Sequence, residues 1–196
     1  MKQINALIVD KDRSRGSLLK RSLKDYGHHV VARVPDGRAM FLAIEEFEVD
    51  VIVIGIELPD EDTLADVARM STINPHPVVM FAEKDAPQII QKVIQSGVST
   101  FIIDDIQPQR ITSIIQVAMA RFNEMQQLRN ELEDTKTKLA DRKVIDKAKG
   151  LIMSEKGIDE EEAYKSLRKM AMDKGQNMAV VAQNIIDVFS LMNAKY

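Results

Sequence analysis

The chain has 196 residues, of which 45% are hydrophobic and 29% are charged, a composition typical of one large or two small folded domains. The lack of cysteine excludes disulfides, thiolate catalysis and cysteine-ligated metals, and the net charge of −3 argues against indiscriminate binding to nucleic acid. The longest apolar run, residues 51–56, is far shorter than the roughly 20 residues that span a bilayer, and the first residues look like a strand rather than a signal peptide, so we expect a cytoplasmic protein.

Five apolar runs alternate with amphipathic stretches of helical length over the first 105 residues. The runs occupy residues 6–9, 30–32, 51–54, 78–81 and 100–103. Turn-forming residues stand between them. Because strands joined by helical crossovers form a parallel sheet with both faces covered, we predict a doubly wound, flavodoxin-like (βα)5 domain with its functional crevice at the carboxyl ends of the strands.

A single long helix is predicted from about residue 107, because neither glycine nor proline occurs between Pro108 and Gly150. Over residues 111–122 we expect its apolar stripe to pack on the sheet. The stripe then continues where no sheet remains to cover it, and this predicts a short coiled coil that joins two copies of the chain. The seam residues of this coiled coil are Met125, Leu128, Leu132 and Leu139.

Residues 141–196 contain three short amphipathic stretches, each with one apolar face, which can close a small helical bundle. The second stretch starts at the capping pattern of Asp159 and Glu162 and ends at Gly175. The only aromatic residues of note here, Tyr164 and Phe189, are expected to fill the bundle core. The chain therefore divides into a first domain at 1–122, a coiled-coil linker at 123–140 and a three-helix domain at 141–196.

The ends of the predicted strands carry a recognisable set of positions. They are Asp10, Lys11, Gly55, Ala82 and Asp104. Because of where these positions stand, residues 4–122 resemble the receiver domain of bacterial response regulators. Receivers have, at the corresponding points, an acidic pair that holds magnesium, a phosphoacceptor aspartate, a hydroxyl residue and a lysine. Only Asp10 keeps the residue type of the family. The resemblance therefore implies a pseudo-receiver with no phosphoacceptor, since Gly55 stands at the expected position.

Phosphotransfer at the standard site is chemically unavailable, because a glycine has no carboxylate and a lysine ammonium offers no lone pair to magnesium. We expect no metal and no cofactor. Glu57 is an alternative acceptor, although the nearby Pro59 places it in a loop. The exchanged charges of Lys11 and Asp104 suggest an ion pair of reversed polarity that locks the pocket; two unrelated surface charges are the alternative.

A basic stretch precedes the predicted bundle: residues 136–149 hold six basic and two acidic residues. The cations predicted to lie opposite the apolar face are Arg142, Lys143, Lys147 and Lys149. Such a face is a candidate contact for a phosphate backbone, and Gly150 on the same side allows close approach of another backbone or a ribose. An ordinary solvated helix face is the alternative.

Three segments carry a second resemblance. They are Arg-Lys-Val-Ile-Asp-Lys-Ala-Lys-Gly-Leu-Ile-Met at 142–153, Glu-Glu-Glu-Ala-Tyr-Lys-Ser-Leu-Arg-Lys-Met-Ala-Met at 160–172 and Met-Ala-Val-Val-Ala at 178–182. With this combination, residues 128–190 resemble the ANTAR domain of bacterial transcription antiterminators. The whole layout is most similar to the regulators of nitrate and nitrite assimilation operons, with the amidase-operon antiterminator a more distant relative.

The resemblance implies a protein that binds two hairpins of a leader mRNA and so prevents formation of a terminator. It also implies a homodimer and a separate cytoplasmic ligand-sensing regulatory protein as partner, with no membrane involved. The candidate RNA-binding residues are Arg142, Lys143, Lys147, Lys149, Arg168 and Lys169.

Two other classes of function stay open. One is a phospho-dependent regulator with a non-standard acceptor, and the other is a dimerisation or scaffold module that binds no RNA. An enzyme is not expected, because no nucleophile and base stand at a catalytic spacing and no glycine loop could cradle a phosphate. His28 and His29 precede a strand and are expected in a partly exposed turn.

Overall fold

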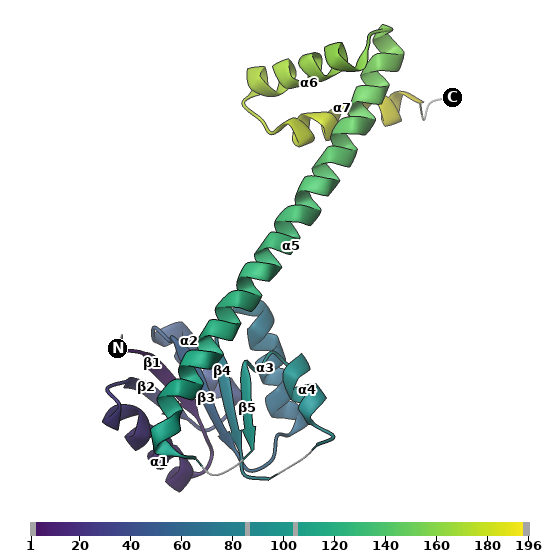
Figure 1. Cartoon of the computed structure of the whole chain (residues 1–196). Coiled ribbons are helices and arrows are strands. Elements are labelled where there is room, and N and C mark those ends of the chain that lie inside the picture. The colour runs from purple at the N-terminus through teal and green to yellow at the C-terminus, as the bar shows by residue number, and fades with distance from the viewer. Residues whose placement is uncertain (1–2, 85–86, 104–105, 194–196) are drawn as a thin grey trace. The chain divides into compact units, whose positions relative to one another are not determined.

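The computed structural model describes residues 3–84, 87–103 and 106–193. Its first unit is built on a five-stranded parallel sheet with the strand order β2-β1-β3-β4-β5. The strands are β1 (Asn5–Val9), β2 (His29–Val34), β3 (Val51–Ile56), β4 (Val78–Ala82) and β5 (Thr100–Ile103). The predicted flavodoxin-like (βα)5 fold is confirmed, and Figure 1 shows the strands side by side.

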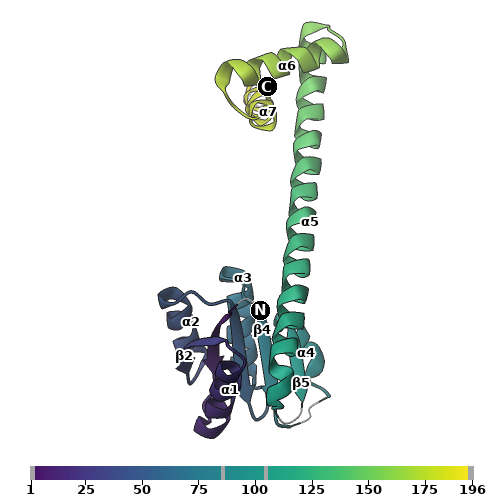
Figure 2. The same cartoon turned by 60° about the vertical axis from the view of Figure 1, so that its left-hand side comes forward.

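Helices cover both faces of this sheet (Figures 1 and 2). The helices of the first unit are α1 (Arg13–Asp25), α2 (Gly37–Glu46), α3 (Glu61–Ile73), α4 (Ile90–Gln95) and the beginning of α5 (Pro108–Lys156). One apolar core joins the sheet to α1 and α5, and a second joins it to α2, α3 and α4. Ile111, Ile115 and Ala118 are fully buried in the first core, so the expectation that the start of α5 packs on the sheet is correct.

Three aspartates start three helices next to the carboxyl ends of the strands. The side chains of Asp12, Asp36 and Asp60 each accept a hydrogen bond from a backbone N–H in the first turn of α1, α2 and α3. Such caps satisfy N–H groups that have no partner within the helix. The acidity of this edge of the sheet therefore has a structural cause.

Helix α5 continues without interruption for 49 residues and runs through both compact units of the chain, residues 1–126 and 127–196. In the second unit its last turns pack with α6 (Glu160–Lys174) and α7 (Met178–Asn193). Helices α6 and α7 lie side by side in both views (Figures 1 and 2). The long helix and the three-helix arrangement agree with the prediction.

The core of the second unit is small and aliphatic. Its fully buried members include Ala148, Ala163 and Leu167. Helix α6 ends at Gly175, whose φ of 59° is the left-handed conformation that glycine adopts most easily. The prediction that Tyr164 fills this core is wrong: small core residues let the helices pack closely, and 40% of the tyrosine is exposed. Phe189 is half-buried.

Candidate functional site

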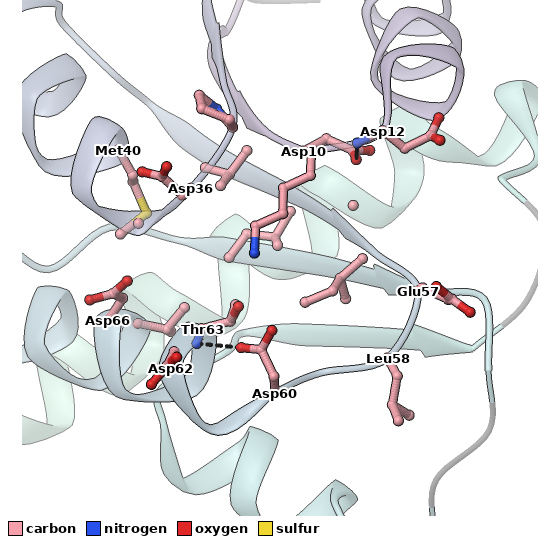
Figure 3. Close-up of a pocket in the computed structure, with 18 of the residues that line it drawn as sticks. Asp10, Asp12, Asp36, Met40, Glu57, Leu58, Asp60, Asp62, Thr63 and Asp66 are labelled. Atoms are coloured by element: carbon pink, nitrogen blue, oxygen red, sulfur yellow. Dashed lines mark hydrogen bonds between the residues drawn. The ribbon is translucent and has the colours of Figure 1, made fainter.

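A pocket of about 870 Å³ opens at the carboxyl ends of β1 and β3, where receivers carry their chemistry (Figure 3). Asp10 directly follows β1, and its side chain is fully buried. Gly55 lies within β3. Ala82 ends β4 and is also buried. The described positions of this set, Asp10, Lys11, Gly55 and Ala82, thus lie at one edge of the sheet, as the sequence predicts.

The guanidinium of Arg15, from the first turn of α1, fills the space beside Asp10. Its Nε donates to Asp10 Oδ2 at 2.9 Å and its Nη2 to Asp10 Oδ1 at 2.8 Å, while Nη1 reaches Glu83 Oε1 at 2.5 Å. Burial acts to lower the pKa of Arg15, but the bonds to Asp10 and Glu83 raise it overall. Sequence reasoning missed this residue.

A magnesium ion does not fit these residues. Both carboxylate oxygens of Asp10 are already bonded to Arg15, and the second acid of the family's pair is replaced by Lys11. Magnesium needs several oxygen ligands in octahedral geometry, and here a guanidinium with fixed N–H donors balances the charge of Asp10 instead.

Gly55 is required by this arrangement. A Cβ at residue 55 would lie 2.2 Å from Asp10 Oδ2 and 3.0 Å from Arg15 Nε. Both neighbours are held by their mutual bonds, so a side chain at this position would have to displace the pair. The glycine that removes the acceptor is the same residue that makes room for the Asp10 and Arg15 pair.

Glu57, the alternative acceptor, lies beyond the end of β3. Its side chain is 61% exposed and forms an ion pair with Lys84. The hydrogen bond from Lys84 lowers the pKa of the Glu57 carboxyl. The proposed partner of Lys11, Asp104, lies outside the described residues; Lys11 itself lines the pocket, and its charge adds to the hydrogen bonds from Thr63 that lower the pKa of Asp60.

His28 is placed differently from the prediction. It is 4% exposed, because the start of α5 covers it, and its Nε2 lies 3.4 Å from Thr112 Oγ1. Its Nδ1 has no hydrogen-bond partner among the described residues. Burial lowers the pKa of His28, so the imidazole is neutral near pH 7. The expectation of a partly exposed turn holds for His29, which is exposed, but not for His28.

The four candidate cations on α5 fall into two pairs. At about 100° per residue, Lys149 lies about 20° from Arg142 around the helix, whereas Lys143 and Lys147 lie about 100° and 140° from Arg142. Lys143 and Lys147 are exposed. The four cations span about 160°, an arc that lies opposite the apolar stripe, and Arg142 is exposed as well. Only Lys149 departs from the expectation of an exposed face.

Lys149 is held by two carboxylates and is only 13% exposed. Its Nζ lies 2.8 Å from Asp146 Oδ1 and 2.6 Å from Glu160 Oε1. Glu160 is the first residue of α6. The hydrogen bonds to Asp146 and Glu160 raise the pKa of Lys149. Arg142 Nε also approaches Asp146, at 3.9 Å. The helical pattern alone places Lys149 in open solvent, because it does not reveal the turn that brings Glu160 back to α5.

Helix α6 presents its own exposed side. Arg168 and Lys169 are exposed, as expected of candidates for RNA contact, and so are Tyr164 and Met172. Tyr164 was missed as a surface residue, although its position one residue after Ala163 places it at the margin of the apolar stripe. The signal that could have found it is its spacing of four from Arg168, which makes the two side chains neighbours on the helix.

The predicted coiled-coil seam is exposed along the middle of α5. Its members, Met125, Leu128, Leu132 and Leu139, are each between 53% and 56% exposed. Large apolar side chains repeated along one exposed stripe are typical of a surface that another protein covers. Among the described residues, no helix is long and apolar enough to cross a membrane.

Two protein-family models match parts of the chain. The family model of the response regulator receiver domain matches residues 6–116, and that of the ANTAR domain matches residues 133–186. Both resemblances found from the sequence motifs are thereby confirmed. The first match includes the pocket of the first unit, and the second includes the end of α5, all of α6 and the first part of α7.

Among curated proteins, the transcriptional regulatory protein PdtaR of Mycobacterium tuberculosis is 22% identical over 169 residues, which are 86% of this chain and 82% of that protein. The nitrate regulatory protein of Klebsiella oxytoca is 40% identical over 78 residues, 40% of this chain and 20% of that protein. The aliphatic amidase regulator of Pseudomonas aeruginosa is 25% identical over 109 residues, 56% of each chain.

Solved structures support the fold of the first unit. The signal receiver domain of the putative response regulator NarL from Mycobacterium tuberculosis superposes with a TM-score of 0.54 at 21% identity and covers 60% of this chain and 98% of that one. The receiver domain of a modulated diguanylate cyclase from Desulfovibrio desulfuricans gives 0.56 at 15% identity and covers 63% and 99%. At these identities the likeness concerns the fold alone.

Proposed function

Because the chain belongs to the response regulator receiver family and carries a C-terminal ANTAR domain, we propose that it is an RNA-binding transcription antitermination regulator that works without phosphorylation of its receiver. It binds two hairpins of a leader mRNA and prevents a terminator from forming. The observation that carries this proposal is the set of exposed cations on α5 and α6 within the ANTAR match, of which Lys143, Lys147, Arg168 and Lys169 are freely accessible.

The RNA contact is assigned to the six basic residues of the sequence analysis with a division of roles. Lys143 and Lys147 contact phosphates directly, because they are exposed and lie one turn apart. Arg142 and Lys149 contribute once a phosphate competes with the carboxylate of Asp146. Arg168 and Lys169 extend the surface onto α6.

The active form is a homodimer joined through α5, with residues 123–140 as the coiled-coil segment. The exposed seam of Met125, Leu128, Leu132 and Leu139 supports this, because four large apolar side chains on one stripe gain little from facing water. A dimer presents two RNA-binding units. Once one hairpin is bound, the second binds at a high effective concentration, which matches a leader with two hairpins.

Control comes from a partner protein that senses a small molecule and releases the regulator. The residues at the receiver site support this. Arg15 balances the charge of Asp10 and Gly55 offers no acceptor, so the receiver fold is free to act as a docking surface. To raise the RNA-binding state from about 1% to about 99%, release must change its free energy by about 5.5 kcal/mol. The similarity to a nitrate regulatory protein supports nitrate and nitrite assimilation genes as targets. We place this regulation in the cytoplasm.

The test is to select two-hairpin RNAs with randomised loops on the purified full chain, and to measure binding of the selected RNA and a scrambled control at two salt concentrations. We expect tight, salt-sensitive binding of the selected RNA alone. The double variant Lys143→Glu and Lys147→Glu should weaken binding and lower the salt slope by about 2, because two phosphates are no longer neutralised. Lys20→Glu with Lys24→Glu, an exposed pair at the same spacing on α1, is the matched control.

Failure to select any RNA, or equal effects of the two double variants, would contradict the proposal and favour a dimerisation or scaffold module. A phospho-dependent regulator makes a different prediction. Incubation with acetyl phosphate would then add the mass of one phosphoryl group to the chain, and Glu57→Gln would abolish that addition.

A further inference from the structure

Tyr164 is exposed on α6 although the helix has an apolar core stripe next to it. The core positions Ala163, Leu167 and Ala171 pack inward, while 40% of Tyr164 faces solvent. Tyr164 is hydrogen-bonded to none of the other described residues. A partly exposed aromatic ring on a helix surface, not tied down by a hydrogen bond to another described residue, can offer apolar area to a ligand.

The surroundings of Tyr164 are ordered along one flank of α6. Glu160, Tyr164, Arg168 and Met172 follow one another at intervals of four residues, so each lies about 40° around the helix from the one before. We call these four residues the α6 flank. At one end the flank is tied to α5 through the ion pair of Glu160 with Lys149. Arg168 is exposed and forms no ion pair with another described residue, and Met172 is 71% exposed.

We infer that Tyr164 is a stacking platform for one unpaired nucleobase in an RNA hairpin loop, with Arg168 bonded to the phosphate next to that base. The inference rests on the proposed RNA binding and names the subsite that reads the loop. In a hairpin, loop bases are unstacked and can lie flat on an aromatic ring, whereas bases within the A-form stem are enclosed by their neighbours. The exposed ring therefore fits a loop base and not the stem.

The charges along the α6 flank determine on which side of Tyr164 the phosphate of the bound nucleotide lies. Glu160, Glu161 and Glu162 make the first turn of α6 acidic and repel phosphates there. One turn beyond Tyr164, Arg168 offers a planar fork of N–H donors that suits a phosphate. A base over Tyr164 thus has its phosphate on the Arg168 side. Met172 adds an adaptable apolar contact at the far end.

The chain contains no tryptophan, so Tyr164→Trp introduces one tryptophan at the subsite, whose emission can be excited separately from that of the tyrosines. We expect the emission of this variant to be quenched when the full chain binds a hairpin RNA that the wild type has selected from a library of randomised loops. Abasic substitution of each loop nucleotide in turn should remove the quenching at one position. Abasic substitution in the stem should not.

Affinity gives a second readout. Tyr164→Leu should weaken binding of the selected hairpin roughly 5- to 150-fold, the range found when an aromatic that stacks on a base is removed. Tyr164→Phe keeps the ring and should bind as the wild type does. Tyr26→Leu is the matched control, because Tyr26 is 42% exposed but lies in the first unit, and it should leave affinity unchanged. Circular dichroism confirms that each variant is folded.

The proposed function and the stacking subsite can be overturned separately. If the wild-type chain selects no hairpin RNA, the proposed function and the inference are both overturned. If the wild type binds RNA but Tyr164→Leu binds equally well, or Tyr164→Trp is not quenched by any loop, the stacking subsite is wrong and the RNA-binding function stands.

Discussion

Each unit of the molecule holds a cation between two carboxylates, and the two arrangements differ in one respect. In the first unit Arg15 joins Asp10 and Glu83, and in the second Lys149 joins Asp146 and Glu160. Both cations are 13% exposed. Asp10 is fully buried, however, whereas 52% of Asp146 and 70% of Glu160 are exposed.

Burial of the acid decides what such a pair does. A carboxylate removed from water must keep a hydrogen-bonded cation, because an isolated buried charge is very unfavourable. An exposed carboxylate regains water when its partner leaves, and the pair contributes little to stability. The first arrangement therefore fixes the receiver pocket in one state, and the second can exchange its carboxylates for an incoming phosphate.

The largest expected effect comes from breaking the buried pair. Arg15→Met leaves the Asp10 carboxylate without a counter-charge and should lower the free energy of unfolding by about 3–5 kcal/mol. Urea denaturation followed by circular dichroism measures this. Adding Asp10→Asn to Arg15→Met should recover most of the loss, since the second change removes the buried charge. A loss below about 1 kcal/mol in the single variant would contradict the distinction drawn between the two arrangements.

A methyl group at residue 55 should strain the same pair. Gly55→Ala places a Cβ against Asp10 and Arg15 and should cost about 1–3 kcal/mol, as overpacking does elsewhere. Gly150→Ala is the matched control, because nothing lies within 4 Å of its added Cβ, and it should stabilise the helix by roughly 1 kcal/mol. Equal shifts of the two urea midpoints would show that the tight contact at residue 55 does not constrain the pocket.

His28 should make stability depend on pH. Its folded-state pKa lies below that of the unfolded chain, about 6.5, so the unfolded state takes up a proton first as the pH falls. Stability is therefore unaffected well above about pH 6.5 and is lost below it, by at most about 1.4 kcal/mol per pH unit. Urea titrations between about pH 5 and pH 8 should show a shallower loss in His28→Gln than in the wild type. His29→Gln, altered at an exposed site, should follow the wild type.

The smallest effect is expected from the exposed pair. Glu160→Gln should leave the urea midpoint almost unchanged, because residue 160 is largely exposed and Lys149 keeps its bond to Asp146. The same change should slightly tighten RNA binding, since it removes a carboxylate that competes with phosphate for Lys149. A clear fall in stability would show that this pair also acts as a fixed structural link between α5 and α6.

Much of the fold follows from periodicity, and the details of the site do not. Alternating apolar runs and breakers predicted the sheet, and the lack of glycine and proline predicted α5. Gly55 was found from its place in a motif. The role of Arg15 depends on which way the first turn of α1 faces, which spacing along the chain does not determine.

The residues misplaced from the sequence share a physical cause. His28 is buried because α5, more than 80 residues away in the chain, returns to cover it. Tyr164 and Lys149 lie at the margins of apolar stripes, where a small rotation of a helix decides between core and solvent. Whether such a residue is buried is settled by the neighbouring helix and not by its own segment.

The lack of a phosphoacceptor at Gly55 also affects how the duration of a response is set. An acyl phosphate is hydrolysed at a characteristic rate, so a phosphorylated receiver measures the duration of its own response. At residue 55 this chain forms no acyl phosphate and has no such clock. Under the function proposed above, the length of the response is governed by how quickly the RNA and partner complexes dissociate.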